Sequence, residues 1–341
     1  MDFALVWFIL LAVLWTGYLV LEGFDFGVGM LLPFAGRNNT ERRVALNTIG
    51  PVWDGNEVWL LTAGGATFAA FPEWYATMFS GFYLPLLLIL VALILRAVAI
   101  EYRGKINSEV WRRRWDMVII GSAWVPSILW GVAFSNLVRG VNLDADHQYS
   151  GTFFDLLNPF ALLGGVVTLL LFLSHGSIFL ALKSDGIVRE RAEKLARQFS
   201  LYAIVAAGAW AVWGQIAFAN AAWTWAAVAV AAVALVITWV ATGLKKFGLA
   251  FTANAIGIAA AVVFIFGSLY PDVMPAINDP ANSLTVDNAS STDYTLKVMT
   301  WVAVIFTPIV LAYQSWSYWV FRKRLHVDHI PEHKELTFNK G

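Results

Sequence analysis

Long runs of apolar residues alternate with short polar connections along most of the chain. Eight of these runs are long enough for a transmembrane helix, which needs roughly 20 predominantly apolar residues. A ninth run is shorter and contains Asn56, Glu57 and the Gly64-Gly65 pair, so by itself it also fits a re-entrant segment. The predicted spans cover about residues 3–32, 55–71, 74–99, 117–138, 159–182, 199–219, 223–244, 250–270 and 298–321.

The distribution of Lys and Arg decides whether the ninth run crosses the membrane. If all nine cross, 20 basic residues lie on one side, two lie on the other, and Arg96 lies inside a span. Cytoplasmic loops carry the excess of positive charge, and without the ninth span Arg37, Arg42 and Arg43 would leave the other basic loops. We therefore expect an all-α integral membrane protein with nine transmembrane helices, arranged as two four-helix bundles plus one peripheral helix. The N-terminus is expected outside and the C-terminus in the cytoplasm, with residues 1–341 forming a single transmembrane domain.

The composition agrees with this class and excludes several kinds of chemistry. Hydrophobic residues make up 59% of the chain and charged residues 13%, whereas soluble domains are about half apolar and one quarter charged. The 17 Trp residues also fit, since indole rings favour the lipid–water interface. The absence of Cys excludes disulfides, cysteine-ligated iron–sulfur clusters, covalent c-type haem and thiol nucleophiles. A net charge of zero indicates no nucleic-acid partner, and without a basic n-region the first run is expected to be a retained helix.

Two of the connections have distinctive sequences. Pro271–Lys297, expected outside, is rich in Asp and is predicted to form a cap over that end of the helices. Lys183–Arg197, expected in the cytoplasm, is predicted to be helical, with its charges in solvent or near lipid headgroups.

Charged residues within the spans are the first candidates for function, because charge inside a bilayer is costly. Glu22 and Asp25 in the first span form an i,i+3 pair on one helix face, and so do Asp54 and Glu57 in the second. All four fall in the predicted cytoplasmic half, where such a set of carboxyl groups can take up protons from the cytoplasm. Their predicted charge partners are Arg96 and Glu101.

Structural explanations compete with the proton-path interpretation of these carboxylates. Asp54 precedes Glu57 by three residues, a spacing that also fits a helix cap in which Asp54 accepts from backbone N–H groups. Glu22 and Asp25 could also simply pair with a basic group on a neighbouring helix. The capping role of Asp54 is compatible with a role in proton uptake.

Other residues that the pattern singles out have structural explanations too. Glu101 and Asp116 lie near the predicted membrane boundary and fit ordinary boundary charges. Gly23 and Gly27 form a small-xxx-small face that favours helix packing. His175 is the only His inside a span, and such a residue is more often a hydrogen-bonded packing residue than a ligand.

Haem ligation by this chain is not expected. A single intramembrane His cannot supply the paired axial ligands of a low-spin b haem. The tail sequence HVDHIPEH contains His326, His329 and His333, which could bind a metal adventitiously, but a solvated tail is the simpler interpretation. The chain itself is therefore predicted to hold no redox centre.

Distinctive motifs surround the candidate carboxylates: GFDFGVGMLLPFAGRNNTERR, WDGNEVWLLTAGGATFAAFPEWYA, SGFYLPLLL and the stretch from Arg96 to Arg103. These segments closely resemble subunit II of cytochrome bd oxidases. The joint occurrence of GRNNTERR and WDGNEVW at this spacing is specific, whereas GFDFG alone would not be. The similarity is densest over residues 15–140 and continues through SHGSIFLALK and the last span, so it covers essentially the whole chain.

The resemblance implies a haem-free subunit of a terminal quinol:oxygen oxidoreductase in the bacterial inner membrane. Its partner, subunit I, would hold two b haems, one d haem and the quinol site. The complex would reduce oxygen to water and build a proton gradient without pumping, taking its chemical protons from the cytoplasm. Some members of the family carry a structural quinone in subunit II, and contacts to small accessory subunits and membrane lipids are compatible with the sequence.

The resemblance also assigns roles to single residues. In the family, acidic residues of subunit II contribute to a proton path along the interface with subunit I. Asp25 in GFDFG and Asp54 in WDGN occupy the matching positions. Glu22 stands where many relatives have Asp, which preserves the charge but lengthens the side chain. Trp59 resembles a residue near the family's oxygen access route.

Two other functions stay open at this stage: a proton-coupled secondary transporter with a carboxylate relay, and a purely structural scaffold for a haem-bearing partner. Transporters typically have polar, Gly- or Pro-broken helices at corresponding positions of two halves. Only the second span and the region of Pro308 approach this pattern, and they do not correspond. The absorbance spectrum discriminates, because an oxidase subunit should be colourless alone and show b- and d-type bands with its partner.

Overall fold

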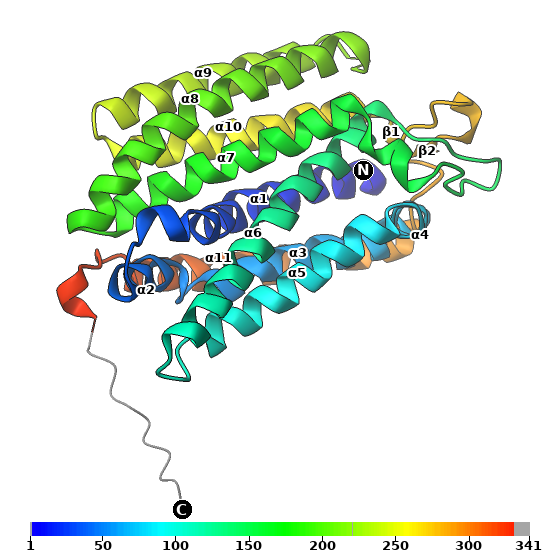
Figure 1. The fold of residues 1–341 in the computed structure, drawn as a ribbon. Coiled ribbons are helices and arrows are strands. Elements are labelled where there is room, and N and C mark those ends of the chain that lie inside the picture. The colour runs from blue at the N-terminus through cyan, green and yellow to red at the C-terminus, as the bar shows by residue number, and fades with distance from the viewer. Residues whose placement is uncertain (1, 220, 331–341) are drawn as a thin grey trace, which may run out of the picture.

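The computed structural model of the protein describes residues 2–219 and 221–330. Most of its helices lie side by side along one common direction (Figure 1). The long helices are α1 (Phe3–Ala35), α3 (Trp53–Ala70), α5 (Tyr83–Tyr102), α6 (Glu109–Arg139), α7 (Pro159–Lys183), α8 (Gly186–Ala217), α9 (Thr224–Gly243), α10 (Phe247–Leu269) and α11 (Asp293–Val320). The shorter elements are α2 (Asn39–Ile49), α4 (Pro72–Gly81), η1 (Phe153–Leu157), β1 (Asp272–Met274), η2 (Pro280–Asn282), β2 (Leu284–Thr285) and η3 (Val327–His329).

Eight of the described helices are long and apolar enough to cross a membrane, namely all the long ones except α3. The structure therefore confirms a helical, multi-span architecture. Helix α3 occupies the predicted ninth span with 18 residues, but its first turns contain Asp54, Asn56 and Glu57. A helix of that length rises about 27 Å, close to the thickness of the hydrocarbon core. The elements that flank α3 lie at opposite ends of the molecule, α2 at one and α4 at the other (Figure 1). Nine crossings stay a prediction.

The centre of the structure is formed by α1 and α7, which pack against each other. Helix α1 also packs against α3, α6 and α10. Helices α8 and α9 lie at one edge of the molecule, and α3, α5 and α11 lie towards the opposite edge (Figure 1). Among the described residues of α11, only Leu296 is buried. The division into two four-helix bundles plus one peripheral helix stays a prediction.

Close packing of α1 against α7 depends on the glycines predicted to form a packing face. A Cβ atom added at Gly27 would lie 2.7 Å from the Cα of Gly176, and one added at Gly23 would lie 2.7 Å from the ring of Phe172. Both distances are below van der Waals contact, so side chains at these positions would push the helices apart. Small residues at such positions let membrane helices approach closely, and this prediction is confirmed.

The predicted third span, residues 74–99, is wrong as a single helix. The structure breaks it into α4 and α5 at Phe82, whose N–H donates to the carbonyl of Met78 at 2.8 Å. The reason is Pro85, which has no N–H to bond the carbonyl of Gly81 and whose ring would clash there in a continuous helix. Within the first turn of a new helix, the same Pro is tolerated.

The connection between α1 and α3, predicted to be cytoplasmic, folds into α2, a helix that the sequence interpretation missed. Asn38 is its N-cap and accepts from the Glu41 N–H at 2.9 Å, while Glu41 accepts from the Arg37 N–H at 2.7 Å. The Glu41 carboxylate also accepts from Arg191 of α8 at 2.6 Å. Burial would raise the pKa of Glu41, but the hydrogen bonds from Arg191 and Arg37 outweigh it and lower that pKa below its ordinary value. These contacts explain the polar GRNNTERR motif.

Asp116 of α6 anchors the same end of the molecule. Its carboxylate accepts from Arg103 at 2.5 Å and from Arg42 at 2.8 Å, and the residue is 3% exposed. The expectation that Asp116 is an ordinary boundary charge is therefore wrong. Glu101 is exposed at the end of α5, as a boundary charge would be.

The two distinctive connections are both ordered. The charged stretch predicted to be helical forms the first turns of α8 from Gly186 onwards, which confirms that prediction. The helix therefore begins before residue 199, where the predicted span starts. In the predicted cap, β1 pairs with β2 in antiparallel fashion. The N–H of Val141 donates to the carbonyl of Pro275 at 2.9 Å, which ties the cap to the end of α6.

Candidate functional site

Three predicted site residues, one each from α1, α3 and α5, meet through their charged side chains. Arg96 of α5 forms ion pairs with Glu22 of α1 and with Glu57 of α3, the latter at 2.6 Å. Glu22 is fully buried and Arg96 is 1% exposed. The side chain of Glu57 is 21% exposed, so one arm of this group reaches the surface of the chain. The structure thus places Arg96 against two of the predicted site carboxylates.

Local geometry explains why these side chains converge. Glu22 and Phe26 are one helical turn apart on α1 and so share a face. The ring of Phe26 lies under the guanidinium of Arg96, 4.6 Å from its Cζ to the ring centroid. The Nε and Nη1 atoms of Arg96 are buried and have no hydrogen-bond partner among the described protein groups. Such polar atoms are the positions where internal water bridges protein groups.

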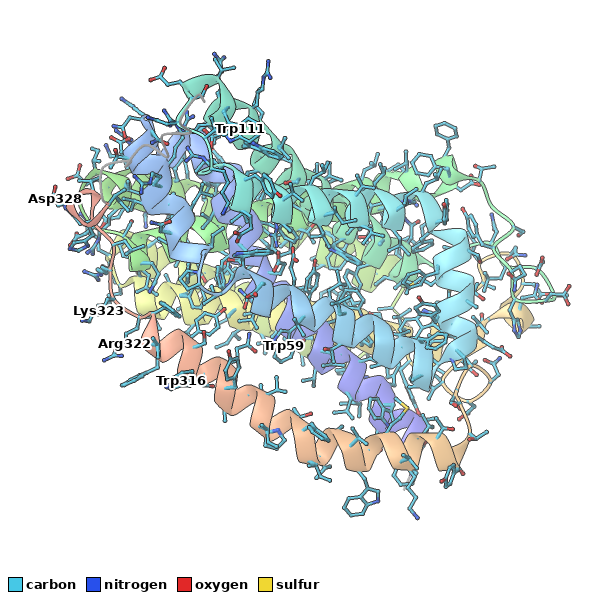
Figure 2. All side chains as sticks on the ribbon, turned by 90° about the horizontal axis from the view of Figure 1, so that it is seen from below. Trp59, Trp111, Trp316, Arg322, Lys323 and Asp328 are labelled. Carbon is cyan, nitrogen blue, oxygen red and sulfur yellow. The ribbon has the colours of Figure 1, made fainter. Side chains whose placement is uncertain are left out.

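Asp25 lies three residues after Glu22 on the same face of α1, and it is hydrogen-bonded to a chain of polar side chains that sequence reasoning missed. Its Oδ2 accepts from the Nδ2 of Asn56 at 2.7 Å. The Oδ1 of Asn56 accepts from the hydroxyl of Tyr318 at 2.7 Å and from the Nε2 of Gln314 at 3.3 Å. The Oε1 of Gln314 in turn accepts from the Nε1 of Trp59 at 2.8 Å. Trp59 thus lies on the side of α3 that faces α11 (Figure 2).

We call Glu22, Asp25, Glu57 and Arg96 the carboxyl cluster. It holds three carboxyl groups and one guanidinium, and Asp25 is fully buried like Glu22. Two of its carboxyl groups come from α1 and one from α3, so the packing of those helices sets the spacing. Because the carboxyl cluster has more carboxyl groups than counter-charges, it can hold a variable number of protons. Its chemical capacity is therefore to bind and release protons.

Two predicted site residues do not join the carboxyl cluster. Asp54 is exposed near the start of α3 and forms no ion pair with the residues that the structure describes. The interpretation of Asp54 as a helix cap is wrong, because the N-cap of α3 is Val52 and no side chain caps that end. Glu101 is likewise exposed and pairs with none of the described residues.

His175 is a packing residue, as the sequence interpretation favoured. Its Nε2 lies 3.1 Å from the carbonyl oxygen of Val20, and its Nδ1 lies 3.0 Å from the Nδ2 of Asn254. These partners fit a neutral ring with the proton on Nε2. The ring also stacks on Phe251 with a centroid separation of 4.4 Å. Both ring nitrogens are therefore occupied by protein groups.

His326 and His329 are the tail histidines that the structure describes. Among the described residues, no group of three His, Cys, Asp or Glu side chains is placed to hold a metal ion. The Nδ1 of His329 accepts from the N–H of His326 at 3.1 Å. His333, the third His of the tail motif, lies outside the described residues.

Comparison of this chain with known proteins identifies its family. Residues 3–321 match the sequence profile of the family described as cytochrome bd terminal oxidase subunit II. The chain is 44% identical over 324 residues to the cytochrome bd ubiquinol oxidase subunit 2 of Bacillus subtilis, covering 94% of this chain and 96% of that protein. It is 38% identical over 351 residues to the cytochrome bd-I ubiquinol oxidase subunit 2 of Escherichia coli, covering 92% and 93% respectively.

The fold is also that of a solved oxidase chain. A chain from the structure of bd oxidase from Geobacillus thermodenitrificans superimposes with a TM-score of 0.78 at 17% sequence identity. The match covers 94% of this chain and 99% of that chain. Together with eight apolar helices of membrane-spanning length, the relatives establish a multi-pass protein of the bacterial inner membrane. The chain belongs to the cytochrome bd terminal oxidase subunit II family, and it is a subunit of an oxidoreductase complex.

Proposed function

We propose that this chain is the haem-free subunit of a quinol:oxygen oxidoreductase, that it supports assembly of subunit I, and that it delivers cytoplasmic protons for the reduction of oxygen to water. The observation that carries the proposal is the carboxyl cluster, in which Glu22 and Glu57 pair with the buried Arg96 and the fully buried Asp25 lies on the same helix face as Glu22. Buried charge in a membrane is costly and typically marks ion or proton pathways. Oxygen reduction consumes protons, so an oxidase needs such a pathway.

The path begins at the cytoplasmic end of α3. Asp54 and Glu57 lie one turn apart on α3, and Asp54 is the exposed member of the pair. Protons taken up near Asp54 pass to Glu57, which is partly exposed, and then to Glu22 across the guanidinium of Arg96. Arg96 balances the charge while the number of bound protons changes.

The hydrogen-bonded chain from Asp25 through Asn56 to Tyr318 forms a second arm of the same site. Asp25 shares a face of α1 with Glu22. Protonation of either carboxyl group therefore changes the electrostatic energy of ionising the other. The hydroxyl of Tyr318 places α11 in contact with this arm. Trp59, bonded to Gln314 of α11, keeps its proposed place near the route of oxygen.

The orientation rests on the distribution of basic residues between the two ends. Helix α2 lies at one end of the molecule, and the N-terminus with β1 and β2 lies at the other (Figure 1). Arg37, Arg42 and Arg43 belong to the first of these ends. We therefore place that end in the cytoplasm, with α3 as the ninth membrane crossing.

The haems of the complex belong to subunit I. The donor set of this chain does not fit a haem, because the one His within a span, His175, engages Val20 and Asn254 with its two ring nitrogens. Two b haems, one d haem and the quinol site are accordingly assigned to the partner. This chain then contributes protons and structural support, not electrons.

Subunit I covers the surface near Glu57. A carboxylate that is 21% exposed within a membrane segment needs a polar neighbour, since contact with lipid chains is unfavourable. Beside Glu57 on α3, Val58 is 50% exposed and Leu61, one turn further on, is 75% exposed, which suits an apolar protein contact. The proton path would then run along the interface between the subunits.

Oxygen consumption by the purified complex tests the proposal. Asp25→Asn should slow quinol-driven oxygen consumption by about tenfold or more, as expected for loss of a proton-transfer group, while the b- and d-type absorbance bands stay unchanged. Glu101→Gln, which removes an exposed carboxylate at the same end, is the matched control and should be fully active. Full activity of Asp25→Asn would leave only the scaffold role, and haem bands in the isolated chain would contradict the haem assignment.

A further inference from the structure

A groove lies between the start of α8 and the end of α9. These two helices form the edge of the molecule opposite α3, α5 and α11 (Figure 1). Its volume is about 860 Å³. We call it the α8–α9 groove, and its lining includes Lys194, Arg197, Trp239, Val240, Leu244 and Lys245. None of these residues belongs to the carboxyl cluster, so the groove is a separate feature.

Arg197 is the central cation of the groove, and the structure holds it in place. Its guanidinium stacks on the ring of Trp239, with 4.2 Å from Cζ to the ring centroid. Its Nη1 donates to the carbonyl of Trp239 at 3.0 Å. A Cβ atom at Gly243 would collide with this guanidinium, so the glycine leaves room for it. A guanidinium has five N–H donors, and one hydrogen bond to the described residues leaves most of them available for a ligand.

Lys245 adds a second cation in an unusual conformation. Its backbone φ of +56° lies in the left-handed region that helices most often give to Gly at this position. Its Nζ lies 3.0 Å from Glu193, whose other oxygen accepts from Arg189 at 3.0 Å. Glu193 is thus neutralised by two cations, and its charge does not cancel that of Arg197.

The remaining charges leave the groove positive. Once Lys245 and Arg189 have paired with Glu193, Lys194 and Arg197 remain in the lining against one acidic residue, Glu190. Glu190, the other acid, stands one helical turn before Lys194. Arg and Lys at a membrane boundary are the groups that bind phosphate-containing headgroups.

The walls of the groove are apolar on the side of α9. Val240 is 45% exposed and Leu244 is 62% exposed. Trp239 has the aromatic character typical of the lipid–water interface. A cationic floor with an apolar wall beside it matches a lipid, whose phosphate and acyl chains need both surfaces at once. A soluble anion would use only the cations.

We propose that the α8–α9 groove binds an anionic phospholipid, with the headgroup phosphate on Arg197 and Lys194 and an acyl chain against Val240 and Leu244. This inference goes beyond the proposed proton delivery. Only its assignment to the cytoplasmic leaflet rests on the proposed orientation. The edge position of α8 and α9, away from the surface assigned to subunit I, exposes the groove to lipid.

A local fluorescence measurement on the complex in vesicles tests the proposal. The chain has no Cys, so Leu244→Cys gives this subunit a single labelling site for a fluorophore beside the groove. The probe lipid is brominated phosphatidylglycerol, which quenches the label when it binds, titrated into phosphatidylcholine vesicles. Brominated phosphatidylcholine and phosphatidylethanolamine serve as the comparison lipids. The readout is the mole fraction of brominated lipid that gives half-maximal quenching.

Phosphatidylglycerol should quench at a markedly lower mole fraction than the other two lipids. In Lys194→Gln the half-maximal fraction should rise about fivefold, and in Lys194→Gln/Arg197→Gln more than that, as expected for lost contacts between basic side chains and anionic lipid. Arg113→Gln/Arg114→Gln removes two exposed charges outside the groove and should leave quenching unchanged. If the double variant fails to assemble, Lys194→Gln alone tests the contact with the headgroup.

Three results would overturn the proposal. One is equal quenching by the three brominated lipids, which would mean no preference for an anionic headgroup. Another is an equal response of the groove variants and the Arg113/Arg114 control. The third is displacement of the lipid by inorganic phosphate as readily as by unlabelled phosphatidylglycerol, which would identify a soluble-anion site.

Discussion

Replacing Arg96 by Gln removes the guanidinium of the carboxyl cluster. Glu22 would keep its fully buried position without its ion-pair partner. Removing one member of a buried ion pair costs about 3–5 kcal/mol, because the other charge stays uncompensated. Since ~1 kcal/mol moves the melting temperature of a protein of this size by roughly 1–2 °C, we expect Arg96→Gln to lower it by about 5 °C.

A second change separates this electrostatic cost from lost packing. Glu22→Gln in the Arg96→Gln background removes the unpaired carboxylate while keeping the size of the side chain. If burial of charge causes the loss, the double variant should recover at least about 1 kcal/mol, a coupling in the range for residues in direct contact. Arg113→Gln, which removes an exposed charge, is the control and should change stability by about 0.5 kcal/mol or less.

The assay is thermal unfolding of the purified complex in detergent, followed by Trp fluorescence. A melting temperature of Arg96→Gln within about 1 °C of the unchanged protein would refute the reasoning, since a loss of 3–5 kcal/mol is far larger. It would mean that solvent already screens the cluster. A double variant less stable than Arg96→Gln would show that Glu22 contributes through packing and not through its charge.

Three further predictions concern the surroundings of the site. Tyr318→Phe removes the hydroxyl that donates to Asn56 at 2.7 Å. Thermal unfolding should show a loss of stability of about 1 kcal/mol. An unchanged stability would mean that α11 is held without this hydrogen bond. Gly27→Leu should prevent assembly of a stable complex, because a Cβ atom there already meets the backbone of α7. The measurement is the amount of complex recovered after purification, and a normal amount would contradict the close packing. Glu41→Gln should lower the melting temperature at neutral pH, where the lowered pKa of Glu41 keeps its carboxylate charged beside Arg191. That contribution is present above the ordinary Glu value of about 4.3 and is lost as pH falls through the lowered folded value, so the difference between Glu41→Gln and the unchanged protein should shrink in acid. A difference that stays constant with pH would contradict the ion pair.

Charged residues of the site could be predicted from the sequence because charge is rare in apolar runs. Glu22, Asp25 and Arg96 each stand alone among hydrophobic neighbours, so their positions were informative without any contact information. Glu57 was identified in the same way, and the structure brings it to Arg96. Asp54 and Glu101 carry the same kind of signal, but they lie near helix ends where exposed charges are ordinary.

The uncharged polar residues of the site could not be predicted in this way. Asn56, Gln314 and Tyr318 become a hydrogen-bonded chain only because α11 packs beside α3. That contact joins residues more than 250 positions apart in the sequence, and helical periodicity says nothing about which helices are neighbours. A Gln and a Tyr one turn apart on the last span were the only available signal.

The same limits explain the differences in the fold. Apolar length predicted the long helices, but it merged α4 with α5, because both are apolar and the break at Phe82 depends on the position of Pro85. Helix α2 was missed since it is short and polar, and its ends are set by contacts of Asn38 and Glu41. Its capping motif was visible in GRNNTERR, and reading that motif as a helix start would have found it.

Proton uptake by the carboxyl cluster is the central claim, and its rate can be measured directly. In the purified complex, the fully reduced enzyme is mixed with oxygen, and a pH-sensitive dye in the surrounding medium reports the protons taken up while the haem bands report electron transfer. Asp25→Asn should slow proton uptake by about tenfold or more at unchanged haem content, and Glu101→Gln should match the unchanged protein. Proton uptake at the normal rate in Asp25→Asn would contradict the account.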